Sequence, residues 1–175
     1  MQYLDKDELR GLFAVAYQCN RNHHLAMVVG LWHGARVSEI VSLTGADVFN
    51  GQLSIKRLKR SLPTVQPIRK DADPLFDERP LIELAKQNPK GRLFPFTRQR
   101  CDQFIKRYAE LAGINPDKAH MHSLKHSVAM LLWDATGNLG QIQNYLGHRA
   151  ASSTLIYLAE ADARKAQVAL AGVQI

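Results

Sequence analysis

Apolar residues at helical spacing open the chain. They fall on one face of an expected helix, at Leu4, Leu9, Leu12, Phe13 and Ala16. Asp5 precedes most of this run and Glu8 follows three residues later, a pairing typical of a helix N-terminus. The pattern predicts a first helix that begins at Asp5 and packs its apolar side on the core.

A second, more uniformly apolar stretch predicts a helix over about residues 22–33. Gly34 can end that helix in a left-handed turn. A short third helix containing Ser38 and Glu39 is expected to close near Leu43. Arg36 therefore lies at a junction between helices.

The helical spacing is lost between residues 48 and 68. Asn50-Gly51 is a turn typical of a β-hairpin, and the flanking apolar residues predict a small antiparallel sheet. Pro63 and Pro67 each remove a backbone donor, so the last strand is expected at an edge of the sheet.

The remainder is predicted to be mainly helical. A loop is expected over residues 71–80, with a short helix near 81–87 and a basic amphipathic helix over 98–112. Helix then continues to about residue 171, with breaks near 137–140 and at Gly147. We predict one α+β domain over residues 1–175 that is mostly α-helical, with a small antiparallel β-sheet.

Composition narrows the class of partner. Lys and Arg outnumber Asp and Glu by 23 to 16, giving a formal charge of +7 and an isoelectric point of about 9.6. This balance favours a polyanion as the large partner.

The two cysteines and the apolar runs indicate an intracellular protein. Cys19 and Cys101 lie far apart without a CxxC partner, and we expect both to be buried, reduced thiols. The apolar run 25–32 is too short to span a bilayer, and no signal peptide opens the chain. We expect a soluble cytoplasmic protein.

Arg36 and Glu39 form the first candidate site for phosphate chemistry. The planar guanidinium of Arg36 can bind two phosphate oxygens at once. Glu39, three residues on, can orient it from the same helical face. A surface salt bridge is the simpler interpretation of this pair alone.

A second candidate lies in the predicted helix that contains His122, Lys125 and His126. These three share a face opposite an apolar stripe, and a histidine three residues from a cation can bind one phosphate jointly. An ordinary solvated face shows the same pattern. His122 and His126 also have the spacing of a helical metal pair, but Ser123 stands where a zinc protease helix carries Glu, so we expect no metal site.

Tyr157 is the candidate nucleophile, nine residues after His148. A tyrosine has a reference pKa near 10, so the phenol needs a base or a cationic pocket in order to attack. Two cations and two imidazoles from these candidate segments can supply such a base or cationic pocket. The alternative is a core tyrosine with a satisfied hydroxyl.

The predicted hairpin and the basic helix carry most of the clustered positive charge. A lysine at a hairpin tip can protonate a leaving oxygen, a role that arginine does not easily fill. Solvated charge is the simpler interpretation of both segments. The candidate DNA contacts are Lys56, Arg57 and Arg60 on the hairpin, with Arg98, Arg100, Lys106 and Arg107 on the helix.

Together, the segments 33–40, 122–126 and 146–148 with Tyr157 resemble the tyrosine recombinase (phage integrase) family, over about residues 5–157. The resemblance implies a DNA breaking-rejoining enzyme in which Tyr157 forms a 3′-phosphotyrosyl intermediate, without metal or nucleotide cofactor. It also implies a prokaryotic or phage-encoded protein that acts on double-stranded DNA as a homo-oligomer. The catalytic residues that it implies are Arg36, Lys59 (with Lys56 as the alternative), His122, Lys125, His148 and Tyr157, with Glu39 in support.

The chain departs from the family in two respects. The usual His-x-x-Arg box ends in Lys125, which keeps the charge and loses the bidentate fork. The N-terminal domain that closes around DNA in this family is expected to be absent, while residues 160–175 are expected to pack on a neighbouring protomer. A type IB topoisomerase, or a non-catalytic DNA-binding accessory domain of the same fold, is the alternative function.

Overall fold

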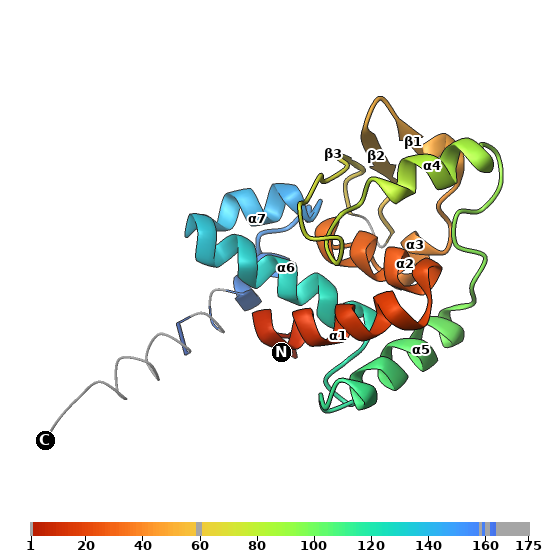
Figure 1. The fold of residues 1–175 in the computed structure, drawn as a ribbon. Helices are drawn as coiled ribbons and strands as arrows, with labels where there is room; N and C mark the ends of the chain where they lie inside the picture. The colour runs from red at the N-terminus through yellow and green to blue at the C-terminus, as the bar shows by residue number, and fades with distance from the viewer. Residues whose placement is uncertain (1, 59–60, 158, 160–161, 164–175) are drawn as a thin grey trace, which may run out of the picture.

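The computed structural model describes residues 2–58, 61–157, 159 and 162–163 (Figure 1). The structure confirms the prediction of a mostly helical domain with a small antiparallel sheet. The helical elements are α1 (Lys6–Cys19), α2 (Arg21–Trp32), α3 (Val37–Ile40), the 3₁₀ turn η1 (Gly45–Asp47), α4 (Pro80–Gln87), α5 (Arg98–Leu111), α6 (Met121–Thr136) and α7 (Leu139–Tyr145).

The start of α1 has the predicted cap. The Asp5 carboxylate accepts from the backbone N–H groups of Asp7 and Glu8, and the Glu8 carboxylate accepts from the N–H of Asp5 at 2.8 Å. These bonds satisfy donors that the first helical turn leaves unpaired. The predicted apolar side is buried, from Leu9 to Ala16.

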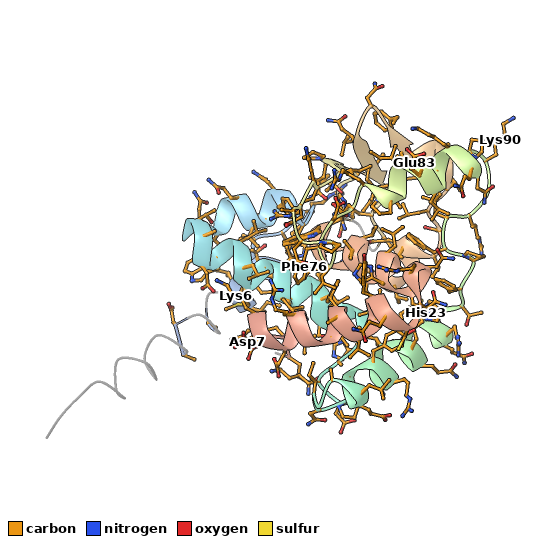
Figure 2. The ribbon with its side chains drawn as sticks, viewed as in Figure 1. Lys6, Asp7, His23, Phe76, Glu83 and Lys90 are labelled. Atoms are coloured by element: carbon orange, nitrogen blue, oxygen red, sulfur yellow. The ribbon has the colours of Figure 1, made fainter. Side chains whose placement is uncertain are left out.

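Helix α2 is the central helix of the core. Asn20 caps it, so it begins at Arg21, slightly earlier than the sequence predicted. It packs on both α1 and α6, and Figure 1 shows these three helices side by side. Near its start lies His23, which is labelled in Figure 2. The His23 ring stacks on Phe104 of α5 with centroids 4.1 Å apart, and its Nδ1 lies 2.7 Å from Tyr108 Oη.

The sheet lies at the end of the helical body opposite α5 (Figure 1). Strands β1 (Val48–Phe49), β2 (Gln52–Ile55) and β3 (Thr64–Pro67) are antiparallel in the order β1-β2-β3. Asn50 and Gly51 make the predicted turn with φ of 48° and 69°. The predicted edge position of the last strand is confirmed.

Left-handed glycines end the later helices where the sequence predicted breaks. Gly137 (φ 59°) follows α6, and Gly147 (φ 66°) follows α7. Residues 152–157 are again helical, while most of the predicted continuation to residue 171 lies outside the described residues. Within the described part of the chain, every helix is too short or too polar to cross a membrane.

The two cysteines differ in environment. Cys101 is buried, and burial raises its pKa to about 11. Cys19 is exposed at the end of α1, so the prediction of two buried thiols is correct only for Cys101.

Candidate active site

A left-handed turn at Gly34 aims the first candidate residues. Gly34 has φ of 53°, a left-handed conformation that favours glycine, and a Cβ there would lie 2.4 Å from Leu146 Cδ2, so the Leu146 side chain would have to shift. Arg36 follows as the N-cap of α3, and Glu39 is the third residue of that helix. Glu39 accepts from the Arg36 backbone N–H and from its Nη1, each at 2.8 Å.

Glu39 is the buried centre of a group that we call the carboxylate cluster: Arg36, Glu39 and Arg57. The carboxylate also accepts from Leu58 N–H at 2.9 Å and from Arg57 Nη1 at 3.3 Å. Burial alone would raise the pKa of Glu39, but the hydrogen bonds from Leu58 and Arg36 and the charge of Arg57 hold it below its ordinary value. Glu39 is therefore a buried carboxylate, and not half of a surface salt bridge.

Arg57 lies in the connection between β2 and β3, which we call the hairpin. Its side chain points into the interior, which corrects its prediction as a contact to DNA. Its side chain has no exposed surface. Its guanidinium donates to the carbonyls of His33 and Gly34 at 2.7 and 3.2 Å and, through Nε, to Thr64 Oγ1 at 2.9 Å. These contacts join the hairpin to the turn before Arg36.

Arg36 remains partly open to the site, with 21% of its side chain exposed. Besides Glu39, Nη1 donates to the carbonyl of Leu58 at 3.2 Å, and both terminal nitrogens lie 3.4 Å from Ser61 Oγ. Ser61 was not predicted as a site residue. The guanidinium is thus fixed from both the helix and the hairpin.

Helix α6 places its three polar residues at different depths. His122 is exposed, His126 is half-buried and Lys125 is only 2% exposed, so the prediction of one outward polar face is wrong for Lys125. Lys125 Nζ is buried without a hydrogen-bond partner among the described residues. Burial, followed by the charges of Arg36 and Arg57, lowers the pKa of Lys125 to about 7, with Glu39 opposing.

The turn before His148 is fastened to the hairpin. A Cβ on Gly147 would lie 2.5 Å from the Leu62 carbonyl, and the Leu62 N–H donates to the Gly147 carbonyl at 2.8 Å. His148 Nδ1 lies 3.0 Å from Thr154 Oγ1. Burial, with the nearby cations Lys125 and Arg36, lowers the pKa of His148 to about 4.

Tyr157 is buried beside two imidazoles. Its Oη lies 3.2 Å from His126 Nδ1, and its ring is nearly parallel to that of His148, with centroids 6.4 Å apart. Burial raises the pKa of Tyr157 to about 12, while the charge of Arg36 acts in the opposite direction. We call Lys125, His126, His148 and Tyr157 the nucleophile cluster.

The remaining predicted residues are spread over the surface or lie outside the description. Lys59 and Arg60 are outside the described residues. Arg107 pairs with Glu110 at 3.3 Å on α5. The other predicted DNA contacts are exposed: Lys56 on the hairpin and Arg98, Arg100 and Lys106 on α5.

Three residues of the site were not among the predicted catalytic residues: His126, which was named only as part of a polar face, and Thr154 and Ser61, which were not named. His126 had a usable signal, because it lies one helical turn after His122. Thr154 lies one turn before Tyr157, but a threonine in an amphipathic segment carries no specific signal. Ser61 meets Arg36 across 25 residues, so spacing alone does not identify it.

Comparisons with known proteins agree on one family. The profile of the Phage integrase family matches residues 2–164. The type 1 fimbriae regulatory protein FimE of Escherichia coli K12 is 30% identical over 181 residues, covering 93% of this chain and 88% of FimE. Tyrosine recombinase XerD of Haemophilus ducreyi is 34% identical over 142 residues, covering 75% of this chain and 48% of XerD.

Solved structures share the fold at lower identity. XerH site-specific recombinase, in a post-cleavage complex with its palindromic difH substrate, matches with a TM-score of 0.72 and 20% identity, covering 96% of this chain and 52% of XerH. The lambda integrase catalytic core matches with a TM-score of 0.67 and 19% identity, covering 86% of this chain and 94% of that core. The chain spans about half the length of the XerD and XerH chains that it matches.

Proposed function

The chain belongs to the phage integrase family, and on that premise we propose that it is a tyrosine recombinase catalytic domain that cleaves and rejoins DNA strands. Site-specific recombination is the function class of this family. The observation that carries the proposal is the burial of the Tyr157 phenol beside imidazoles and cations that come from separate segments of the chain.

The chemistry follows from what each group can do. Tyr157 Oη attacks a DNA phosphorus, the bond from phosphorus to the 5′-oxygen breaks, and a 3′-phosphotyrosyl link remains. Arg36, Lys125 and His148 bind the phosphate oxygens, His122 assists proton transfer, and Lys59 protonates the leaving oxygen. Rejoining reverses these steps, so neither a nucleotide cofactor nor a metal is needed.

Features of the DNA-free site support phosphate binding. Lys125 Nζ has no hydrogen-bond partner in the described part of the chain, although a buried ammonium is costly without one. The contact of His148 Nδ1 with Thr154 leaves Nε2 as the nitrogen available for a phosphate oxygen. Bound phosphate would supply the partner that Lys125 Nζ lacks among the described residues and could also accept from His148 Nε2.

Double-stranded DNA and further copies of this chain are the proposed partners. Lys56, Arg98 and Arg100 are exposed and can offer phosphate contacts. Residues 160–175, which lie almost entirely outside the described residues, are proposed to pack on a neighbouring protomer in a tetramer on DNA.

Covalent trapping tests the nucleophile. Wild-type protein incubated with a pool of nicked duplexes should form a DNA adduct that mass spectrometry places on Tyr157, and chelation with EDTA should not slow it. Tyr157→Phe should form none while still binding DNA, because the nucleophilic oxygen is removed. An adduct on another residue would defeat the assignment, and plasmid relaxation without recombinant product would favour the topoisomerase alternative.

Lys59 has its own test. Lys59→Ala should slow adduct formation about a hundredfold, because the leaving oxygen loses its proton donor. A duplex with sulfur in place of the bridging 5′-oxygen has a leaving group that needs no proton, so the variant should recover on it. If it does not, Lys56→Ala is the next variant, and failure of both removes the general-acid role from the hairpin.

A further inference from the structure

The side chain that meets the nucleophilic oxygen is His126. Its Nδ1 lies 3.2 Å from Tyr157 Oη, between residues 31 positions apart in the chain. His122, the histidine that the family resemblance makes catalytic, lies one turn earlier on α6 and is exposed. The two imidazoles touch edge to face, with ring centroids 4.4 Å apart.

We propose that His126 is a catalytic residue that accepts the phenolic proton of Tyr157 as Oη attacks phosphorus, and returns it when the strand is rejoined. This inference rests on the proposed strand-cleavage function. His122, which we expect to assist proton transfer, is then not the first acceptor of this proton. Because His122 is exposed and contacts His126, it can receive the proton next.

The protonation states in the DNA-free site suit this role. Burial, followed by the nearby groups His122, His120 and Lys125, lowers the pKa of His126 to about 3. The imidazole is therefore neutral at physiological pH, and the tautomer with its hydrogen on Nε2 presents the lone pair of Nδ1 to the phenol. Tyr157, with its raised pKa, keeps its proton and donates it to this nitrogen.

The wide separation of the two pKa values also determines when the proton moves. His126 is too weak a base to ionise Tyr157 in the empty site, so a free phenolate does not accumulate there. Two changes favour transfer once DNA is bound. First, the phosphate brings negative charge next to the positive charges that lower the pKa of His126. Second, the phenolic oxygen becomes far more acidic as it bonds to phosphorus.

The step balances in atoms and charge. The bond from Tyr157 Oη to phosphorus forms and the bond from phosphorus to the 5′-oxygen breaks. The phenolic proton goes to His126 Nδ1, and the 5′-oxygen takes a separate proton from the hairpin lysine. In rejoining, the 5′-hydroxyl attacks the phosphotyrosyl link, and His126 protonates the departing phenolate.

Two variants separate proton transfer from positioning. His126→Asn places a carbonyl oxygen close to the position of Nδ1, so it can accept the hydrogen bond of Tyr157 but cannot take up its proton. His126→Ala removes both functions. His120→Asn is the matched control, because His120 caps α6 by accepting from Ser123 N–H at 3.0 Å, and asparagine is also a good N-cap.

The measurement is the single-turnover rate of adduct formation on a nicked duplex between pH 6.5 and 9.5. We expect both His126 variants to be slower than wild type by about a hundredfold at pH 7.5. Their rates should rise close to tenfold per pH unit, because hydroxide must then remove the phenolic proton. Free imidazole should partly restore His126→Ala, and His120→Asn should stay within about twofold of wild type.

The outcomes are distinguishable. A wild-type-like rate in His126→Asn, or a uniform loss with an unchanged pH profile and no imidazole rescue, would overturn the proton-transfer role. If His126→Ala does not fold, as judged by circular dichroism, the pH profile of His126→Asn decides alone. Failure of wild type to form any adduct would instead overturn the proposed function.

Discussion

The carboxylate cluster and the nucleophile cluster both bury polar and ionisable groups, but they satisfy them differently. Glu39 receives hydrogen bonds from Arg36, Arg57 and Leu58, and Arg57 in turn reaches two backbone carbonyls. Lys125 Nζ has no hydrogen-bond partner in the described part of the chain. The first cluster fixes the guanidinium of Arg36, which we propose to be catalytic, whereas the second leaves hydrogen-bonding capacity for a ligand.

The pKa values express the same difference. Glu39 has a lowered pKa and stays charged, so its ion pairs persist across the physiological range. Lys125, His126 and His148 have pKa values of about 7, 3 and 4, so burial has shifted each toward its neutral form. An entering phosphate would reverse these shifts, so we expect DNA binding to be coupled to proton uptake.

The largest expected effect is a loss of stability when a substitution removes Arg57 from the carboxylate cluster. Arg57→Met should lower the free energy of unfolding by about 3–5 kcal/mol, because Glu39 keeps its buried charge while losing one cation. Urea unfolding at pH 7 measures the change. The matched control is Lys125→Met, which removes a buried cation without a hydrogen-bond partner and should be neutral or stabilising. Equal destabilisation by both variants would contradict the comparison.

Lys125 should matter for the rate of DNA cleavage, although its replacement is not expected to destabilise the fold. Lys125→Ala is expected to slow adduct formation by more than tenfold, a loss of over about 1.4 kcal/mol of transition-state stabilisation. Lys125→Arg, which restores the bidentate fork of the family, should retain activity. Single-turnover rates at pH 7 decide this, and wild-type-like cleavage by Lys125→Ala would show that the position is idle.

Lys125 should also make stability depend on pH. Its pKa is about 7 in the folded protein and near 10.5 when unfolded, so between these values the unfolded chain binds more protons. The free energy of unfolding of the DNA-free protein should therefore gain a contribution from Lys125 as pH rises from about 7 toward 10. Urea titrations across this range should show a smaller rise for Lys125→Met than for wild type. An identical rise in both proteins would contradict the shifted pKa.

The smallest expected effect concerns the salt dependence of DNA binding. Each phosphate contact contributes roughly 0.9 to the slope of log affinity against log salt. Arg98→Ala and Arg100→Ala should each lower that slope on unrelated duplexes, whereas buried Arg57 should not contribute to it. Binding isotherms for Arg57→Met, under conditions where it is folded, test the contrast. A flat response in wild type would remove the cationic footprint altogether.

Features governed by near neighbours in sequence were predictable. The cap at Asp5, the turn at Asn50-Gly51 and the glycine breaks depend on residues within one helical turn or one hairpin. The pairing of Arg36 with Glu39 likewise spans only three residues. Local hydrogen bonds and helical periodicity are sufficient to specify such features.

Tertiary contacts alone decided the depth of the charged residues and the partner of the nucleophile. The sequence predicted Arg57 as a surface cation. In the structure its guanidinium is buried, because it donates to the carbonyls of His33 and Gly34, more than twenty residues away. Lys125 became buried because neighbouring segments cover a helix face that its own periodicity assigned to solvent. His126 meets Tyr157 across 31 residues, a distance over which sequence spacing carries no geometric information. Burial and long-range contact are properties of how segments pack together, so only the folded structure determined which of the predicted charges are buried in the fold and which remain exposed.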